Sequence, residues 1–317
     1  MVRTAAVVGT LIFALVVTAC GSASGSSASN PTPKPKPAAG PVKFKDATLR
    51  ISAIPDQDPA KLTRLYGEVA TFLVAKLGVK VEYVPVTDYA ASVSAFQLGD
   101  LDLVWFGGLT GVQARLQTKG AQLIGQRDID AKFRTVFIAN AAATIAPFTT
   151  VDGLKAVKGH SITFGSESST SGRLMPQYFL DQAGVATTDL SGRPGFSGGH
   201  DATIKAVEAG TFEVGALNSS VWDGALAAKT VDPTKVIELF RTPPYFDYHW
   251  LARPDLDAKF GKGFSAALSK AILGLDPAKP AEASILTLFG AKGFVPTTAS
   301  NYVQIEKIAR KLGLITG

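Results

Sequence analysis

The sequence predicts an α/β protein with two doubly wound lobes, joined by two crossings, and a ligand cleft between them. Strand-like apolar runs alternate with helix-like segments along the chain, which is typical of parallel sheets covered by helices. About 270 residues follow a polar, proline-rich segment, enough for two lobes. Polar residues gather in the turns from strand to helix, where open α/β sheets bind ligands. We therefore expect the functional residues in these turns.

The first residues predict export. Arg3 precedes an apolar run over residues 5–17, and small residues then lead to Cys20. The run fits a secretory signal and is shorter than the roughly 20 residues of a membrane span. This arrangement resembles the lipobox of bacterial lipoproteins, which implies a signal peptide over residues 1–19 and lipid modification of Cys20. The alternative is an ordinary secretory signal with an incidental cysteine.

The segment over residues 20–45 is expected to be a disordered tether. It consists almost wholly of Gly, Ser, Ala, Pro and Lys and has too little apolar surface to fold. The net charge of the chain is +6, of which five charges belong to Arg3 and the four lysines before residue 46. The remaining +1 for residues 46–317 gives no indication of a nucleic-acid partner.

The first group of elements is predicted from hydrophobic periodicity and capping residues. Asp58 before Pro59 is typical of a helix start, whereas Gly78 and Gly99 are typical of helix ends. The run over residues 101–106 indicates a buried strand. The expected elements are strands over 47–54, 79–84, 101–106, 122–126 and 134–139, and helices over 59–77 and 88–98.

A second group follows an alanine-rich link over residues 140–146. The order of elements predicts one lobe from residues 46–138 together with 246–317, and another from residues 139–245. The expected elements are helices over 151–157, 171–183, 201–209 and 221–228 and strands over 161–164, 195–196, 213–217 and 235–241, then a strand over 248–253 and helices over 254–273, 280–288 and 299–312.

The turn over residues 165–172 is the strongest candidate for a binding site. It reads Gly-Ser-Glu-Ser-Ser-Thr-Ser-Gly and lies between a predicted strand and a predicted helix. Free N–H groups at a helix start bind anions, and hydroxyl side chains add further donors. An ordinary N-cap explains one hydroxyl but not several in succession. The turn therefore predicts an oxyanion site.

Several segments, in this order, resemble a known family. They are Asp88-Tyr89, the run over residues 99–107 (Gly-Asp-Leu-Asp-Leu-Val-Trp-Phe-Gly), residues 164–172, Phe-Ser-Gly-Gly-His-Asp over 196–201, and Thr-Pro-Pro-Tyr-Phe-Asp-Tyr-His-Trp over 242–250. Together they resemble the substrate-binding lipoproteins of phosphonate, phosphite and phosphate ABC importers. The resemblance spans roughly residues 47–300. It implies the type II periplasmic-binding-protein fold, closing over a small oxyanion.

The resemblance also implies the residues of the site. By position, Ser169, Thr170 and Ser171 match the turn that binds the phosphonate group, and Tyr89 matches a tyrosine that reaches the anion from the other lobe. His200 matches a histidine that donates to the anion, and Asp247 an acidic ligand contact. The alternatives are a core aromatic for Tyr89, a helix-start residue for His200 and a hinge cap for Asp247.

Departures from the family narrow the ligand. Residues 218–220 read Asn-Ser-Ser, without the carboxylate that holds the ammonium of aminoalkylphosphonates, and Phe133 lies near the place of an expected tyrosine. We expect a compact anion. Arg173 is shared with a branch of the family usually described as selenate binders. Selenate, however, carries no proton near neutral pH that Asp247 could accept in a hydrogen bond. Phosphate, phosphite and phosphonates can carry such a proton. Arg173 itself is expected to be a solvated helix residue.

The main rival class is a serine hydrolase. Residues 195–199 match Gly-x-Ser-x-Gly, with Ser197 as nucleophile and Asp247 and His249 following in the chain. With 31 glycines such a match arises easily by chance. The three histidines have no metal-ligand spacing. We expect no enzyme activity, no cofactor and no metal, but a monomeric, lipid-anchored binding protein that delivers a small oxyanion to an ABC permease and its ATPase subunit.

Overall fold

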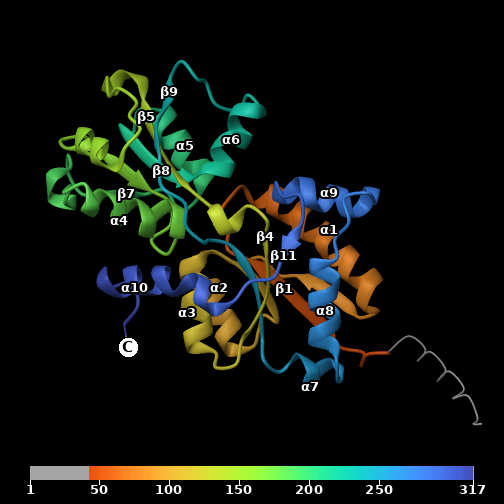
Figure 1. The fold of residues 1–317 in the computed structure, drawn as a ribbon. Helices are drawn as coiled ribbons and strands as arrows, with labels where there is room; N and C mark the ends of the chain where they lie inside the picture. Colours follow the sequence, from red (N-terminus) through yellow and green to blue (C-terminus); the bar gives the residue numbers. More distant parts are fainter. Residues whose placement is uncertain (1–42, 317) are drawn as a thin grey trace, which may run out of the picture. The chain divides into compact units, whose positions relative to one another are not determined.

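The computed structural model describes residues 43–316, and Figure 1 shows their fold. The predicted signal peptide, Cys20 and the predicted tether up to residue 42 lie outside these residues. The described chain forms one sheet of six strands and one of five, with helices packed against them. Each helix in this part of the chain is too short or too polar to cross a lipid bilayer.

The first sheet has the strand order β11-β4-β10-β3-β1-β2. Strands β1, β2 and β3 run parallel, whereas β10, β4 and β11 each run antiparallel to their neighbours. The strands are β1 (Thr48–Ala53), β2 (Lys80–Tyr83), β3 (Leu103–Phe106), β4 (Gln122–Arg127), β10 (His249–Ala252) and β11 (Phe294–Val295). The α-helices of this part are α1 (Pro59–Leu77), α2 (Tyr89–Leu98), α3 (Gly108–Gln117), α7 (Leu256–Phe260), α8 (Phe264–Leu273), α9 (Pro280–Phe289) and α10 (Val303–Lys311).

Helix α1 shows how the sequence determines these elements. The carboxylate of Asp58 accepts hydrogen bonds from the N–H groups of Ala60 and Lys61 at 3.0 and 3.2 Å. Pro59 occupies the first helical position, and Gly78 ends the helix with a left-handed φ of 66°. The helix packs against β2, α8 and α9. Its buried residues recur at helical spacing and are Leu62, Leu65, Tyr66, Val69, Leu73 and Leu77.

The second sheet has the order β7-β6-β8-β5-β9. Strands β6, β7 and β8 run parallel, while β5 runs antiparallel to both β8 and β9. The strands are β5 (Thr135–Asn140), β6 (Ile162–Phe164), β7 (Gly195–Phe196), β8 (Val214–Asn218) and β9 (Val236–Arg241). The helices here are a 3₁₀ helix at Val151–Val157 and α4 (Met175–Gln182), α5 (His200–Glu208) and α6 (Ser219–Ala227).

Strand β5 corrects one sequence prediction. The strand expected over residues 134–139 was placed with the first lobe, but it pairs with β8 and β9 in the second sheet. A strand that enters a sheet directly from a crossing, without a helix before it, is free to run antiparallel. The same holds for β10, which returns from the second sheet to the first. The other proposed lobe boundaries stay predictions.

Helix α3 and the short strand β11 were not predicted, and one predicted helix is divided in two. Helix α3 follows β3 directly, but its sequence contains two glycines and several polar residues, which hid the helical pattern. The helix expected over residues 254–273 is instead two helices, α7 and α8. Gly261 and Gly263 separate them, with φ of 114° and 90°.

The chain crosses between the two sheets twice, over residues 128–134 and over residues 242–248, and the two crossings lie side by side. Phe133 in the first crossing and Tyr245 in the second exchange backbone hydrogen bonds, both at 2.9 Å. The N–H of Asp247 donates to the carbonyl oxygen of Asp130 at 3.1 Å. The second crossing is thus held in register by the first.

A buried ion pair stabilises the first crossing. The guanidinium of Arg127 donates to both carboxylate oxygens of Asp130, at 2.8 and 2.6 Å, and to the carbonyl of Phe289 at 2.8 Å. The side chains are 7% and 0% exposed. The guanidinium also lies over the rings of Trp105 and Tyr248, 5.5 and 5.0 Å from the centroids.

Asp130→Ala is expected to lower the free energy of unfolding by about 3–5 kcal/mol, because it leaves a buried guanidinium without its counter-charge. Asp255→Ala is the control, since Asp255 pairs with Arg253 at 3.0 Å through a carboxylate that is 54% exposed. That variant should lose about 1 kcal/mol or less. Urea unfolding measures the free energy of unfolding of both variants. Equal losses would contradict the view that the Arg127–Asp130 pair stabilises the first crossing.

Candidate functional site

The six residues predicted for the site come from four segments and are all at most 2% exposed. Tyr89 is the first residue of α2, and His200 is the first residue of α5. Residues 169–171 follow β6 and begin a π-helical turn, Thr170–Leu174, that leads into α4. Asp247 lies in the second crossing, just before β10.

The Ser-Thr-Ser turn is fixed by its own backbone and hydroxyl groups. The hydroxyl of Ser169 accepts from the N–H of Gly172 at 3.0 Å, and the N–H of Gly165 donates to the carbonyl of Gly172 at 2.8 Å. A Cβ on Gly172 would lie 2.9 Å from Ser169 Oγ and 3.2 Å from the backbone of Gly165, so this close turn requires glycine. These contacts within the turn hold it in its present shape.

This turn also contacts the first residues of α3, which follow the first sheet. Thr170 Oγ1 accepts a hydrogen bond from the N–H of Leu109 at 2.9 Å, and Asp247 Oδ1 accepts from the N–H of Gly108 at 2.9 Å. A Cβ on Gly107 would lie 3.2 Å from Thr170 Oγ1 and 3.4 Å from Asp247 Oδ1. The start of α3 therefore brings two of the predicted residues together.

Three predicted residues carry buried polar atoms with no hydrogen-bond partner among residues 43–316: Tyr89 Oη, Ser171 Oγ and Asp247 Oδ2. Burial raises the pKa of Tyr89 well above its usual value, with smaller contributions from Asp56 and Asp247, so its hydroxyl keeps its proton. Two hydroxyl donors and one carboxylate acceptor are therefore available to a partner. This set suits an oxyanion that itself carries an O–H group.

Burial raises the pKa of Asp247 from 3.8 to about 7. The N–H of Gly108, the hydroxyl of Thr170 and the charge of Arg127 lower this pKa, and the charge of Asp130 raises it. The carboxyl group consequently changes between its neutral and charged forms near neutral pH. Such a shift at a buried polar cluster is common at functional sites.

His200 has protein partners at both ring nitrogens. The N–H of Asn218 donates to Nδ1 at 3.4 Å, so the ring proton belongs on Nε2, which lies 3.3 Å from Tyr248 Oη. Burial lowers the pKa of His200 to about 3, and the ring is neutral at pH 7. Its expected role as a donor to the anion stays a prediction, and the structure adds a contact to Tyr248.

Arg173 is not the solvated helix residue that the sequence led us to expect. Its guanidinium lies over the rings of Phe164 and Phe196, 4.9 and 5.5 Å from their centroids. Burial lowers the pKa of its guanidinium below the ordinary value. The aromatic faces of β6 and β7 explain its place as packing on the second sheet.

The hydrolase arrangement around Ser197 is not assembled. Its hydroxyl contacts the carbonyls of Phe164 and Gly199 and the hydroxyl of Thr203, at 3.0, 3.1 and 2.6 Å. His249 instead lies 3.3 Å from the Asp247 carbonyl and packs on the Tyr302 ring. No group of three or more His, Cys, Asp or Glu residues within 43–316 is placed to hold a metal ion.

Sequence reasoning missed several polar residues near the site. Asp56 follows β1, Asn218 is the last residue of β8, and Tyr248 follows Asp247; the hydroxyl of Tyr248 contacts both of the others. The positions of Asp56 and Asn218 at the carboxyl ends of strands were a usable signal. Nothing in the sequence indicated that Tyr248 would join them.

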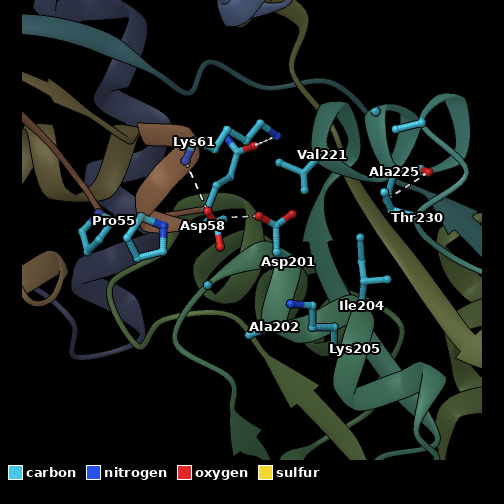
Figure 2. Close-up of a pocket in the computed structure, with 15 residues that line it drawn as sticks. Pro55, Asp58, Lys61, Asp201, Ala202, Ile204, Lys205, Val221, Ala225 and Thr230 are labelled. Atoms are coloured by element: carbon cyan, nitrogen blue, oxygen red, sulfur yellow. Dashed lines mark hydrogen bonds between the residues drawn. The ribbon is translucent and has the colours of Figure 1, made fainter. Parts of the chain in front are cut away.

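Two cavities lie beside these residues. One of about 550 Å³ is bounded by residues 55–61 near the start of α1 and by α5 and α6. Figure 2 shows Asp58 and Asp201 side by side in its wall, joined by a hydrogen bond. The second, of about 240 Å³, has Asp56, Arg127, Tyr248 and Asn218 among its walls. Neither is lined by Tyr89, residues 169–171 or Asp247. The buried cluster is enclosed rather than open to either cavity.

Two mixed sheets, two crossings and a buried polar cluster between them define a two-lobed solute-binding protein. A family model described as "ABC transporter, phosphonate, periplasmic substrate-binding protein" matches residues 51–302. The chain belongs to this family. Its members are substrate-binding proteins of ABC transporters and not enzymes, and a periplasmic family implies an exported protein.

Individual relatives agree with the family. The chain is 46% identical over 279 residues to the probable ABC transporter phosphite binding protein PhnD1 of Prochlorococcus marinus, covering 87% of this chain and 94% of that protein. The solved structure of PhnD1 in complex with methylphosphonate matches with a TM-score of 0.83, over 84% of this chain and 99% of the other. The phosphate-import protein PhnD of Mycolicibacterium smegmatis is 28% identical over 192 residues, 57% of this chain and 58% of that protein.

Proposed function

We propose that this protein is the lipid-anchored solute-binding component of an ABC importer, and that it captures a compact phosphorus oxyanion and delivers it to the membrane permease. The observation that carries the proposal is the unpartnered set of Tyr89 Oη, Ser171 Oγ and Asp247 Oδ2. The set offers two donors to oxygen atoms and one acceptor to an O–H group. Hydrogen phosphate, phosphite and methylphosphonate all present both kinds of atom.

The size and charge of the ligand follow from the surroundings. The cluster is enclosed, and the turn after β8 supplies Asn218 and not a carboxylate. Phe133 is buried and presents no hydroxyl. An aminoalkyl substituent would therefore lack both space and a counter-charge. The names of the relatives support a compact ligand, since they mention phosphite, methylphosphonate and phosphate.

A selenate-type oxyanion is the alternative ligand. Selenate and sulfate carry no proton at neutral pH, so an ionised Asp247 would repel them across a site with little water. A neutral Asp247 would instead donate to them. The protonation of one carboxyl group thus separates the two ligand classes.

Capture would couple to transport through closure of the two lobes. The first comprises residues 46–138 with 246–317 and the second residues 139–245, except that β5 (Thr135–Asn140) belongs to the second lobe. The lobes would turn about the paired crossings, and the closed form would present itself to the permease. We propose a monomer, since each chain carries a complete set of site residues.

Replacing Ser169, Thr170 and Ser171 together by alanine is expected to weaken binding of methylphosphonate at least tenfold, and Thr170→Ala alone by about tenfold. Each hydroxyl contributes a charge-assisted hydrogen bond of about 1.5–3 kcal/mol to an anion held away from water. Calorimetric titration measures the affinity. Ser284→Ala, which changes an exposed hydroxyl bonded to Glu68, is the control. Full affinity in the triple variant would remove this turn from the site.

Asp247→Asn should lose affinity for phosphite, phosphate and methylphosphonate and gain relative affinity for sulfate and selenate. The amide keeps the shape, removes the repulsion and supplies an N–H donor. In the unchanged protein, sulfate binding should strengthen as the pH falls through about 7, because protonation of Asp247 removes its charge. The variant should lack this pH dependence. Tighter binding of selenate than of every phosphorus oxyanion by the unchanged protein would favour the alternative.

The lipid anchor is tested at Cys20. Cys20→Ala should leave the signal uncleaved or release the protein from the membrane fraction, because the thiol that would carry the lipid is lost. Membrane fractionation with immunodetection measures both outcomes. Normal processing with unchanged membrane association would show that Cys20 is not the anchor.

A further inference from the structure

A buried polar network joins four segments beside the candidate site. The hydroxyl of Tyr248 donates to Asp56 Oδ2 at 2.9 Å. The Tyr248 Oη atom also lies 3.1 Å from the donating Nδ2 of Asn218 and 3.3 Å from Nε2 of His200. Asp56 follows β1 of the first sheet, His200 and Asn218 belong to the second sheet's turns, and Tyr248 lies in the second crossing.

The network is fully satisfied only with one arrangement of protons. A tyrosine hydroxyl has one donor and two acceptor positions, and here the donor goes to Asp56 while His200 and Asn218 fill the acceptors. The carboxylate of Asp56 fixes the direction of the hydroxyl proton, since it can only accept while it is ionised. Without it, Tyr248 could turn its proton toward His200 and oppose the Nε2 proton.

Asp56 makes a second contact to the same histidine through its backbone. The N–H of His200, at the start of α5, donates to the carbonyl oxygen of Asp56 at 2.8 Å. A Cβ on Gly199 would lie 3.3 Å from this oxygen, so glycine permits the close approach. Nearby, the N–H of Asp58 donates to Asp201 Oδ2 at 2.9 Å. The loop after β1 and the first turn of α5 are thus joined by two direct hydrogen bonds.

We propose that Asp56 is a positioning residue for ligand capture: through Tyr248 and the backbone of His200 it holds the second lobe closed over the anion. This inference rests on the proposed function. The side-chain bond between Asp56 and Tyr248 lies within the first lobe, and it orients the Tyr248 hydroxyl toward His200 and Asn218 of the second. These contacts of Tyr248, and the backbone bond from His200 to Asp56, join different lobes, so they form when the lobes close. They should therefore contribute to ligand affinity and little to the folding of either lobe.

The buried state of Asp56 agrees with this assignment. The residue is 5% exposed, and burial raises its pKa to about 6, with the hydrogen bond from Tyr248 and the charge of Arg127 acting in the opposite direction. At pH 8 the carboxylate is ionised and able to accept the Tyr248 proton. Burying a carboxylate so that its pKa rises lowers the stability of the folded protein. Such unfavourable burial is typical of functional positions.

The test uses Asp56→Asn, Tyr248→Phe and the double variant at pH 8, titrated with methylphosphonate, phosphite and phosphate. Each single variant should bind the preferred anion about tenfold or more weakly, and the double variant should lose much less than the product of the two, because both remove the same bond. Asp58→Asn is the matched control, since its carboxylate caps only its own helix and asparagine caps equally well.

Two further measurements separate positioning from structure. The ligand-free melting temperature of Asp56→Asn should stay within about 2 °C of the unchanged protein, and small-angle scattering with ligand should show less closure. Unchanged affinity in Asp56→Asn, or a fall in ligand-free melting temperature that accounts for the loss, would overturn the inference alone. Failure of the unchanged protein to bind any of the three anions would overturn the proposed function and this inference together.

Discussion

The geometry of the candidate site depends on the buried ion pair between Arg127 and Asp130. The pair fixes the first crossing, and the backbone carbonyl of Asp130 then accepts the N–H of Asp247 in the second. The guanidinium also supports the rings of Trp105, Phe133 and Tyr248. A buried pair of this kind is weak evidence for net stability, but it allows few alternative arrangements. It therefore specifies where Asp247 and Tyr248 lie relative to both sheets.

Near this pair, two buried groups of the candidate site are neutral at pH 7. His200 is neutral because burial lowers its pKa to about 3, and Tyr89 keeps its proton. Asp247, with a pKa of about 7, is the group whose charge the surroundings leave undecided at neutral pH. A site of neutral donors and one adjustable carboxyl group suits anions that share a proton with the protein. A site built from lysines or arginines would instead attract every small anion, sulfate included.

Much of the fold could be predicted from the sequence because local signals and tertiary structure agree. Helix α1 is the clearest case, with its Asp58 cap, Pro59 and Gly78. The direction of β5 and β10 could not be predicted, because it is set by the crossings and not by the residues of the strands. The Ser169–Ser171 turn was recognisable from its hydroxyls, and its place as an anion site stays a prediction. Asp56 and Tyr248 were not predicted because they lie 192 positions apart in the chain, and no local pattern records their contact. Arg127 and Asp130 are only three positions apart, but the burial of their pair depends on distant partners such as Phe289, 162 positions from Arg127.

Several contacts between the lobes involve backbone groups and glycines, and these contacts would limit what the proposed site admits. The hydroxyl of Thr170 accepts from the amide of Leu109, and the amide of His200 donates to the carbonyl of Asp56. A Cβ added at Gly107 would lie 3.2 Å from Thr170 Oγ1, and one added at Gly199 would lie 3.3 Å from the carbonyl oxygen of Asp56. Backbone contacts cannot adjust by changing rotamers as side chains do. A ligand with a bulky substituent would have to separate all of them at once, whereas a compact anion leaves them in place, so the enclosure itself selects for small ligands.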